Sequence, residues 1–172
     1  MTMLSIHDET GRFLRPLEML GYVREDDRRF TLTPRVLELG FSYLSASAVP
    51  EVIRPHLQVL SESLDESASA AVLDGADIVY VARVPVRRIM SIGIAVGTRF
   101  PAFATSMGRV LLAAADEDTR AAALAEPLPR LTPVTVTDAG SLHAELDRVA
   151  RQGWAVVDGE LEIGLQSVAV PV

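Results

Sequence analysis

The 172-residue sequence contains no cysteine and no lysine. Without cysteine there is no disulfide scaffold, no thiol catalysis and no metal site built on thiolates. Long hydrophobic runs are also missing, because stretches such as Val110–Ala115 are far shorter than the roughly 20 residues that a membrane helix needs. Residues 1–11 carry Asp8 and Glu9 and have no apolar core, so they do not predict a signal peptide. We therefore expect a soluble, cytoplasmic protein with no membrane partner.

The composition that remains is typical of a globular protein. Hydrophobic residues make up 49% of the chain and charged residues 23%, which argues against disorder. The formal net charge is −7, and all 16 basic residues are arginines. A nucleic-acid-binding protein usually presents a basic face, and the composition as a whole does not indicate one.

The first third of the chain predicts a helix, a β-hairpin and a second helix. Apolar residues recur at helical spacing over residues 12–20, and Gly21 ends that helix. Two β-like arms, 22–25 and 29–32, flank a short charged turn. Thr33 is predicted to cap the next helix, whose apolar stripe consists of Val36, Leu37, Gly40, Phe41 and Leu44.

The remaining residues predict a second unit that mixes strands and helices. Pro50 opens a helix, in which Pro55 predicts a kink or the true start. The elements expected after it are a β-hairpin over 71–84 with a turn at Asp74-Gly75, a strand over Ile89–Val96, a loop over Gly97–Gly108, helices over Val110–Ala115 and Glu117–Glu126, a helix capped by Ser141, and strands over Trp154–Val157 and Ser167–Val172. The last strand runs to the end of the chain with no turn after it, which predicts that the domain is incomplete there.

Three sets of motifs resemble the IclR family of bacterial transcriptional regulators. They are Leu20–Val23 with Phe30–Thr33, which is similar to the end of the family's winged helix-turn-helix; Gly97–Pro101 with Ala104–Ala113, which resembles its effector-domain signature; and Gly153–Trp154, Asp158–Glu160 and Gly164–Pro171, which resemble its closing signature. The segments Arg83–Pro85 and Arg88–Met90 look closest to the subgroup that senses aromatic-acid catabolites of the β-ketoadipate pathway.

The resemblance implies an α+β fold and three parts of the chain. Residues 11–33 would be the remnant of a winged helix-turn-helix, 34–48 a linker helix, and 49–172 a six-stranded, GAF-like effector-binding domain that is incomplete at its C-terminus. The implied function is ligand-responsive transcriptional regulation, with a small carboxylate as effector, an aromatic acid or a keto acid. A family member would have two more helices and its recognition helix before Gly11, so we expect DNA binding only through the full-length regulator. The resemblance also implies a homodimer or homotetramer.

The candidate effector site centres on the turn that leads into the helix of the middle signature. A helix N-terminus carries exposed N–H groups and partial positive charge, so it can hold a carboxylate, and Thr105 and Ser106 could add hydroxyl donors. On the residues alone, one of them could equally be a simple helix cap, with Gly108 permitting close packing. The resemblance favours the effector site, for which the predicted residues are Arg88, Met90, Ile92, Thr105, Ser106, Met107, Asp158 and Ser167. Arg83 is a further candidate for pairing an acidic ligand.

Other functions remain open on the residues alone. Ala104–Gly108 nearly matches the G-x-S-x-G elbow of serine hydrolases, with Asp138 and His143 following in order, but those two lie only five residues apart. We therefore expect no enzyme activity. The three histidines lack metal-ligand spacing, so we expect no metal and no other cofactor. The acidic cluster of Asp158, Glu160 and Glu162 is most simply a solvated face. A module that only mediates oligomerisation is the other alternative.

Overall fold

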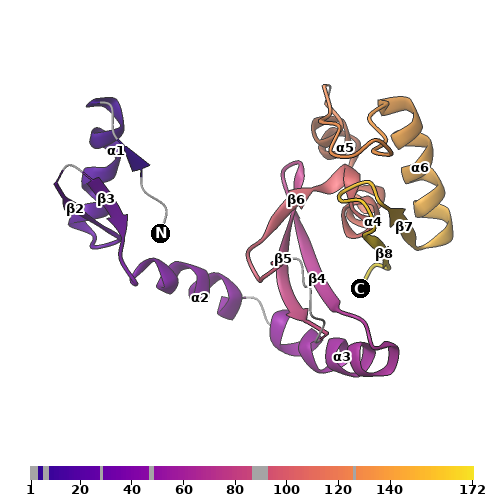
Figure 1. The fold of residues 1–172 in the computed structure, drawn as a ribbon. Coiled ribbons are helices and arrows are strands. Elements are labelled where there is room, and N and C mark those ends of the chain that lie inside the picture. The colour runs from indigo at the N-terminus through magenta and orange to yellow at the C-terminus, as the bar shows by residue number, and fades with distance from the viewer. Residues whose placement is uncertain (1–3, 6–7, 28, 47–48, 87–92, 126) are drawn as a thin grey trace. The chain divides into compact units, whose positions relative to one another are not determined.

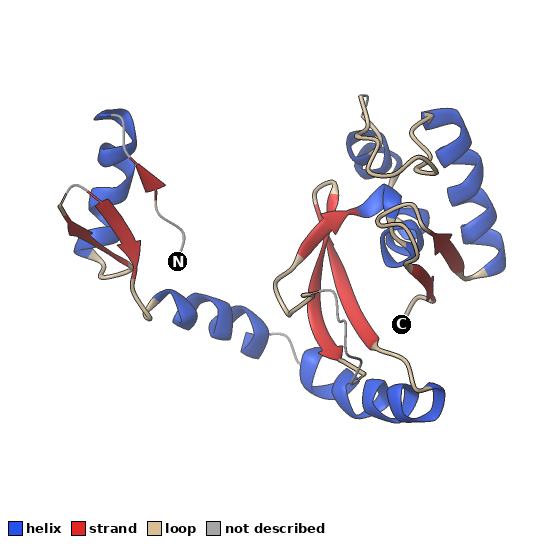
Figure 2. Ribbon diagram, viewed as in Figure 1, coloured by secondary structure: helices blue, strands red, loops and turns tan. Residues whose placement is uncertain are grey.

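The computed structural model describes residues 4–5, 8–27, 29–46, 49–86, 93–125 and 127–172, and these mix helices with antiparallel strands (Figure 2). The chain divides into two compact units, Met1–Val49 and Pro50–Val172. Within the described residues, no helix is both long enough and apolar enough to cross a bilayer. The fold class predicted from the sequence, α+β, is confirmed.

The first unit combines two helices with a small antiparallel sheet (Figure 1). Its elements are β1 (Leu4–Ser5), α1 (Asp8–Met19), β2 (Val23–Asp26), β3 (Arg29–Leu32) and α2 (Val36–Ala46), with strand order β1-β3-β2. Gly21 ends α1 with a φ of +77°, in the left-handed region that favours glycine. The predicted cap at Thr33 is confirmed, since its hydroxyl accepts a hydrogen bond from the Arg35 N–H at 3.3 Å.

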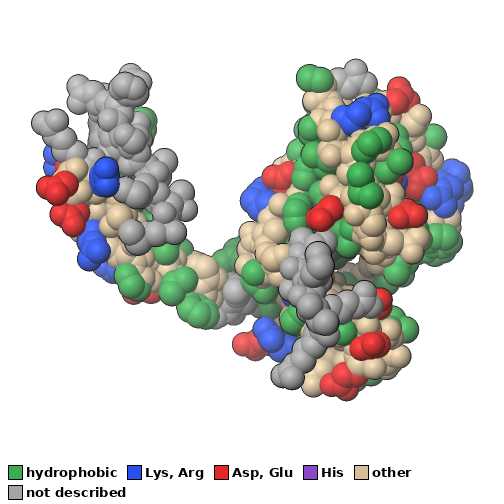
Figure 3. Space-filling view, in the orientation of Figure 1, with side chains coloured by type: hydrophobic (Ala, Val, Ile, Leu, Met, Phe, Trp, Pro, Cys, Tyr) green, Lys and Arg blue, Asp and Glu red, His purple; other side chains and the backbone are tan. Residues whose placement is uncertain are grey.

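Most of α2 is exposed although its sequence is apolar. Hydrophobic side chains are visible along this helix (Figure 3), and the large exposed ones are Leu37, Leu39, Phe41 and Tyr43. Among the residues of this unit whose burial is described, the buried apolar ones, Val23 and Phe30, lie in the sheet instead. Among its described residues, the first unit therefore has a small core and a helix whose large apolar side chains are mostly exposed.

The second unit is built from two antiparallel sheets and the helices around them. Its elements are α3 (Val49–Leu64), β4 (Ala68–Asp74), β5 (Asp77–Val84), β6 (Arg99–Pro101), the 3-10 helix η1 (Ala102–Ala104), α4 (Ser106–Ala114), α5 (Glu117–Ala123), α6 (Ala139–Gln152), β7 (Ala155–Asp158) and β8 (Gln166–Ala169). One sheet has the order β4-β5-β6, and the other pairs β7 with β8.

Helix α4 is the central element of this unit, because it packs against both sheets and against α6. The main core forms around it, and its largest fully buried side chains are Ile78, Leu112, Leu142, Leu146 and Val149. A smaller core lies under α3, where Leu57 packs with Ala68 and Ala82 of the β4–β5 hairpin. The hairpin therefore has one face toward α4 and one toward α3.

Several sequence predictions of element position need correction. Residues 93–96 form no strand, whereas 99–101, placed in a loop by the sequence, form β6; residues 89–92 lie outside the described part. Among the described residues the second unit has five strands in two sheets, and residues 87–92, which include part of the predicted sixth strand, lie outside them. Helices α1 and α3 run through Pro16 and Pro55, each of which removes one backbone hydrogen bond without ending its helix.

The cap of α6 also differs from the prediction. The carboxylate of Asp138 accepts a hydrogen bond from the Ser141 N–H at 2.7 Å, so Asp138, not Ser141, is the N-cap. The Ser141 hydroxyl was a reasonable candidate, but the carboxylate three residues earlier is placed to reach that N–H. The helix ends at Gly153, which adopts a φ of +81°.

Candidate functional site

The turn into α4 is buried within the second unit. Strand β6 leads into η1, whose three residues are fully buried, and Thr105 then precedes the helix in an extended conformation. The Thr105 hydroxyl accepts a hydrogen bond from the Gly108 N–H at 3.1 Å. Thr105 is therefore the N-cap of α4, and the capping role left open for Ser106 belongs to its neighbour.

Gly108 allows η1 to lie directly against the first turn of α4. A Cβ atom at this position would come within 2.1 Å of the Ala102 carbonyl oxygen and 2.4 Å of its Cα. Both are backbone atoms, so they cannot move aside as the end of a flexible side chain would. The packing role predicted for Gly108 is confirmed.

Ser106 and Ser167 come together although they are 61 residues apart in the sequence. The Ser106 side chain, only 2% exposed, donates a hydrogen bond to the Ser167 hydroxyl at 2.9 Å. Ser106 begins α4, and Ser167 lies half-buried in β8. We call these two side chains the serine pair. It places two hydroxyl groups beside a helix N-terminus, which carries partial positive charge.

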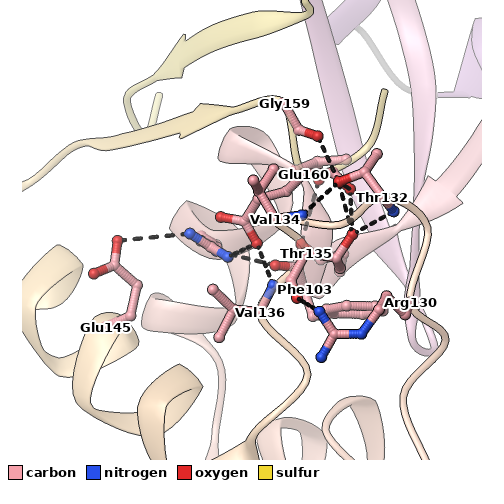
Figure 4. A network of polar contacts seen from close by, with 12 residues as sticks. Phe103, Arg130, Thr132, Val134, Thr135, Val136, Glu145, Gly159 and Glu160 are labelled. Atoms are coloured by element: carbon pink, nitrogen blue, oxygen red, sulfur yellow. Dashed lines mark hydrogen bonds and ion pairs between the residues drawn. The ribbon is translucent and has the colours of Figure 1, made fainter. Parts of the chain in front are cut away.

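A buried arginine one turn further along α4 joins three other segments. Arg109 is 4% exposed, and its Nη2 lies 2.7 Å from the Glu160 carboxylate while its Nε donates to the Phe103 carbonyl at 3.0 Å. Glu145 of α6 lies further away, at 3.8 Å from Nη1. Figure 4 shows Phe103, Glu145 and Glu160 arranged around this guanidinium. Because the ion pair is buried, loss of either partner would leave an uncompensated charge.

The same network holds the connection between α5 and α6. The Glu160 carboxylate accepts a hydrogen bond from the Val136 N–H at 2.9 Å. The hydroxyls of Thr132 and Thr135 donate to the carbonyls of Gly159 and Glu160, each at 2.7 Å. These contacts attach residues 132–136 to the loop between β7 and β8 (Figure 4), and that loop leads into the strand that carries Ser167.

Sequence reasoning missed this role of Glu160. The residue was interpreted as part of a solvated acidic face, but it is 7% exposed and paired with Arg109, whereas Asp158 and Glu162 are exposed as predicted. Alternating acids on a strand end usually face water, and nothing in the local pattern distinguishes the one that turns inward. Arg109, as a charge within an otherwise apolar helix, was the available signal.

The other predicted site residues lie in different surroundings. Met107 is half-buried and packs against the main core. Asp158 is exposed at the end of β7, where it pairs with Gln166, the neighbour of Ser167. The predicted residues Arg88, Met90 and Ile92 lie outside the described residues.

The features of a hydrolase do not come together around Ser106. Its hydroxyl bonds to Ser167, and the predicted acid, Asp138, is engaged as the cap of α6. His143 lies within α6 itself. In the described part of the chain, no three histidine, aspartate or glutamate side chains are grouped as metal ligands. The arrangement is suited to hydrogen bonding and to holding a small polar group.

Comparison with known proteins places residues 41–172 in the family described as bacterial transcriptional regulator IclR, C-terminal. The Pca regulon regulatory protein of Pseudomonas putida is 45% identical over 163 residues, which are 94% of this chain and 56% of that protein. The chain thus spans little more than half the length of this curated relative. Proteins of this kind regulate transcription and are not enzymes.

Solved structures with the same fold include a transcriptional regulator from Rhodococcus sp. RHA1, at 55% identity and a TM-score of 0.78, covering 94% of this chain and 65% of that one. Another is an IclR homologue from Microbacterium hydrocarbonoxydans in complex with 4-hydroxybenzoate. It is 29% identical, with a TM-score of 0.76, over 95% of this chain and 68% of that one.

Proposed function

Because the chain belongs to the IclR family of bacterial transcriptional regulators, we propose that its Pro50–Val172 unit binds a small aromatic carboxylic acid and acts as the sensing part of a ligand-responsive regulator. The observation that carries this proposal is the 4-hydroxybenzoate bound to the Microbacterium relative, which shares the fold over 95% of this chain. The relatedness to a Pca regulon regulatory protein supports the same ligand class.

The serine pair is the polar contact point of the proposed site. Its two hydroxyls, with the N-terminus of α4 beside them, suit a carboxylate or hydroxyl group of a ligand. Thr105 contributes by capping the helix and Met107 by its apolar side chain. We retain Arg88, Met90 and Ile92 as predicted contacts with the acid group and the ring, and Asp158 as an acceptor at the edge.

The rest of the regulator's action follows from coupling between this site and the DNA-binding part. A ligand that binds one arrangement of the protein better than another shifts the balance between them. DNA binding is assigned to the full-length regulator, and the functional form to a homodimer or homotetramer in the cytoplasm.

Titration of the full chain with 4-hydroxybenzoate by isothermal calorimetry tests the proposal. We expect saturable binding, with a rise in melting temperature because a ligand at about 100 times its Kd stabilises the folded state by about 2.7 kcal/mol. 4-Hydroxybenzyl alcohol, which has the ring and hydroxyl but no carboxylate, is the control and should bind more weakly. The proposal would be overturned if hydroxybenzoates, benzoate and keto acids at millimolar concentration gave no heat of binding and no thermal shift.

A further inference from the structure

The β4–β5 hairpin contains a bulge that changes which side chains face α4. Ala71 pairs with Tyr80 but Ala70 pairs with Ala82, so Val81 is an extra residue in β5. Before the bulge, Ile78 and Tyr80 face the main core around α4. Beyond it, Ala82 contributes to the core under α3. The extra residue reverses the alternation, and it places Arg83 on the α4 side, with Tyr80.

Contacts of the side chains agree with this placement. Arg83 Nη1 donates a hydrogen bond to the Ser69 hydroxyl at 3.1 Å, and Ser69 is its partner in the strand register. Burial raises the pKa of Tyr80, and the positive charge of Arg83 opposes that rise, so the two groups lie close enough to interact. Met107, which follows the serine pair residue Ser106, packs against the same core cluster as Tyr80.

The Tyr80 hydroxyl has no hydrogen-bond partner among the residues that the structure describes. The side chain is only 7% exposed, and a buried phenol normally finds a partner. Every fully enclosed side-chain nitrogen or oxygen in the described part is hydrogen-bonded. The unpartnered Tyr80 hydroxyl is therefore not fully enclosed and keeps some contact with solvent.

Arg83 likewise lacks a carboxylate partner within the described residues, since its one polar contact there is neutral Ser69. The residue is half-buried. Arg99, by comparison, lies on β6 near the hairpin turn and pairs with Asp74 and Asp77. A half-buried guanidinium without a counter-ion retains donors for a planar, bidentate anion.

We propose that Arg83 and Tyr80 form the carboxylate end of the effector site, with the guanidinium pairing with the acid group and the phenol donating to it. The serine pair then meets the ligand's ring hydroxyl. This inference rests on the proposed function and adds the residues that select an acid over a neutral ligand. In this arrangement the ligand's carboxylate supplies a counter-ion for the Arg83 guanidinium and a hydrogen-bond acceptor for the Tyr80 hydroxyl, neither of which the described residues provide.

Calorimetric titration of the full chain and its variants tests the inference with 4-hydroxybenzoate, benzoate and uncharged 4-hydroxybenzamide. Arg83→Gln retains a donor for Ser69 but removes the charge, so it should weaken binding of both acids by about ten- to a hundredfold. It should leave the already weak binding of the amide unchanged. Tyr80→Phe should weaken acid binding by about two- to tenfold without lowering the melting temperature, because the hydroxyl has no partner within the described protein. Arg99→Ala, which removes a surface guanidinium near the hairpin turn, is the matched control and should bind as the wild type does.

The outcomes separate the inference from the proposed function. If the wild type binds none of the three ligands, the proposed function fails, and the inference with it. If the wild type binds the acids and both variants bind them equally well, the inference is wrong while the proposed function stands. A loss for acids and amide alike in Arg83→Gln, or a lowered melting temperature in Tyr80→Phe, would assign these residues a structural role and overturn the inference.

Discussion

Three neighbouring residues at the start of α4 have separate tasks. Thr105 caps the helix, Ser106 bonds to Ser167, and Gly108 admits the backbone of η1. The sequence predicts both Thr105 and Ser106 as ligand contacts, with a simple helix cap at one of them as the alternative. The first hydroxyl accepts the Gly108 N–H, which leaves the second for another partner.

Gly108→Ala should destabilise the second unit severely. Its Cβ would lie 2.1 Å from a backbone oxygen, and overpacking a tight site costs about 1–3 kcal/mol or more. Gly140→Ala in the first turn of α6 is the matched control, because its Cβ meets only the Asp138 carboxylate at 3.5 Å and alanine favours a helix. Urea denaturation measures both free energies of unfolding. Equal stability of the two variants would contradict the close approach of η1.

Thr105→Ala and Ser106→Ala should separate stability from ligand binding. Loss of the cap in Thr105→Ala should lower the free energy of unfolding by about 1 kcal/mol. Ser106→Ala should instead lower affinity for a hydroxybenzoate by up to about tenfold, since one net hydrogen bond is worth about 1 kcal/mol. Thermal denaturation and calorimetry on both variants measure the two effects. Unchanged affinity in Ser106→Ala would show that the ligand does not bind at the serine pair.

At the scale of the elements, the ion pair of Arg109 and Glu160 joins α4, η1 and the loop after β7 to residues 132–136. Glu160→Gln should destabilise the unit by about 3 kcal/mol, because it leaves the buried Arg109 charge without its close partner. Glu162→Gln, two residues away and exposed, should change stability by less than about 0.5 kcal/mol. Chemical denaturation compares them, and similar values for both would mean that the buried pair contributes nothing net.

The cap of α6 should make stability depend on acid pH. Hydrogen bonds from the hydroxyl and the N–H of Ser141 hold the pKa of Asp138 below the ordinary value for an aspartate. Because the folded-state pKa is the lower one, this contribution is present above about pH 4, and it is lost as the pH falls through the folded-state pKa. Asp138→Asn retains a good cap without a titrating group.

We therefore expect Asp138→Asn to match the wild type near neutral pH and to lose less stability on acidification. Melting temperatures recorded from pH 6 down to pH 2 provide the comparison. If the melting temperatures of the two proteins fell equally on acidification, the charge of Asp138 would not contribute to the cap.

At the scale of the whole molecule, the uncovered side chains of α2 predict self-association. Leu37 and Phe41 lie one turn apart, and each is more than half exposed, which is unusual for a helix that remains in water. Sedimentation velocity at micromolar concentration should show a dimer or larger species. Leu37→Ser with Phe41→Ser should shift it toward the monomer, whereas Ser42→Ala on the same helix should not. A wild type that sediments only as a monomer would refute this prediction.

The amino-acid pattern alone was enough to predict the family, the α+β class and most of the element order. Local signals were sufficient for the Asp74–Asp77 hairpin turn, for the end of α1 at Gly21 and for the cap at Thr33, because these features depend on residues within a few positions of one another. Motif spacing also predicts the functional importance of the turn at Ala104–Gly108.

Which polar residues contact one another depends on the packing of the folded chain. Ser106 and Ser167 are 61 residues apart, and Arg109 and Glu160 are 51 apart, so no periodicity within a helix or strand connects them. The bulge at Val81 decides which face Arg83 occupies, because one extra residue reverses a strand's alternation. Such pairings depend on how separate elements pack around α4, and a pattern read along one element does not contain that information.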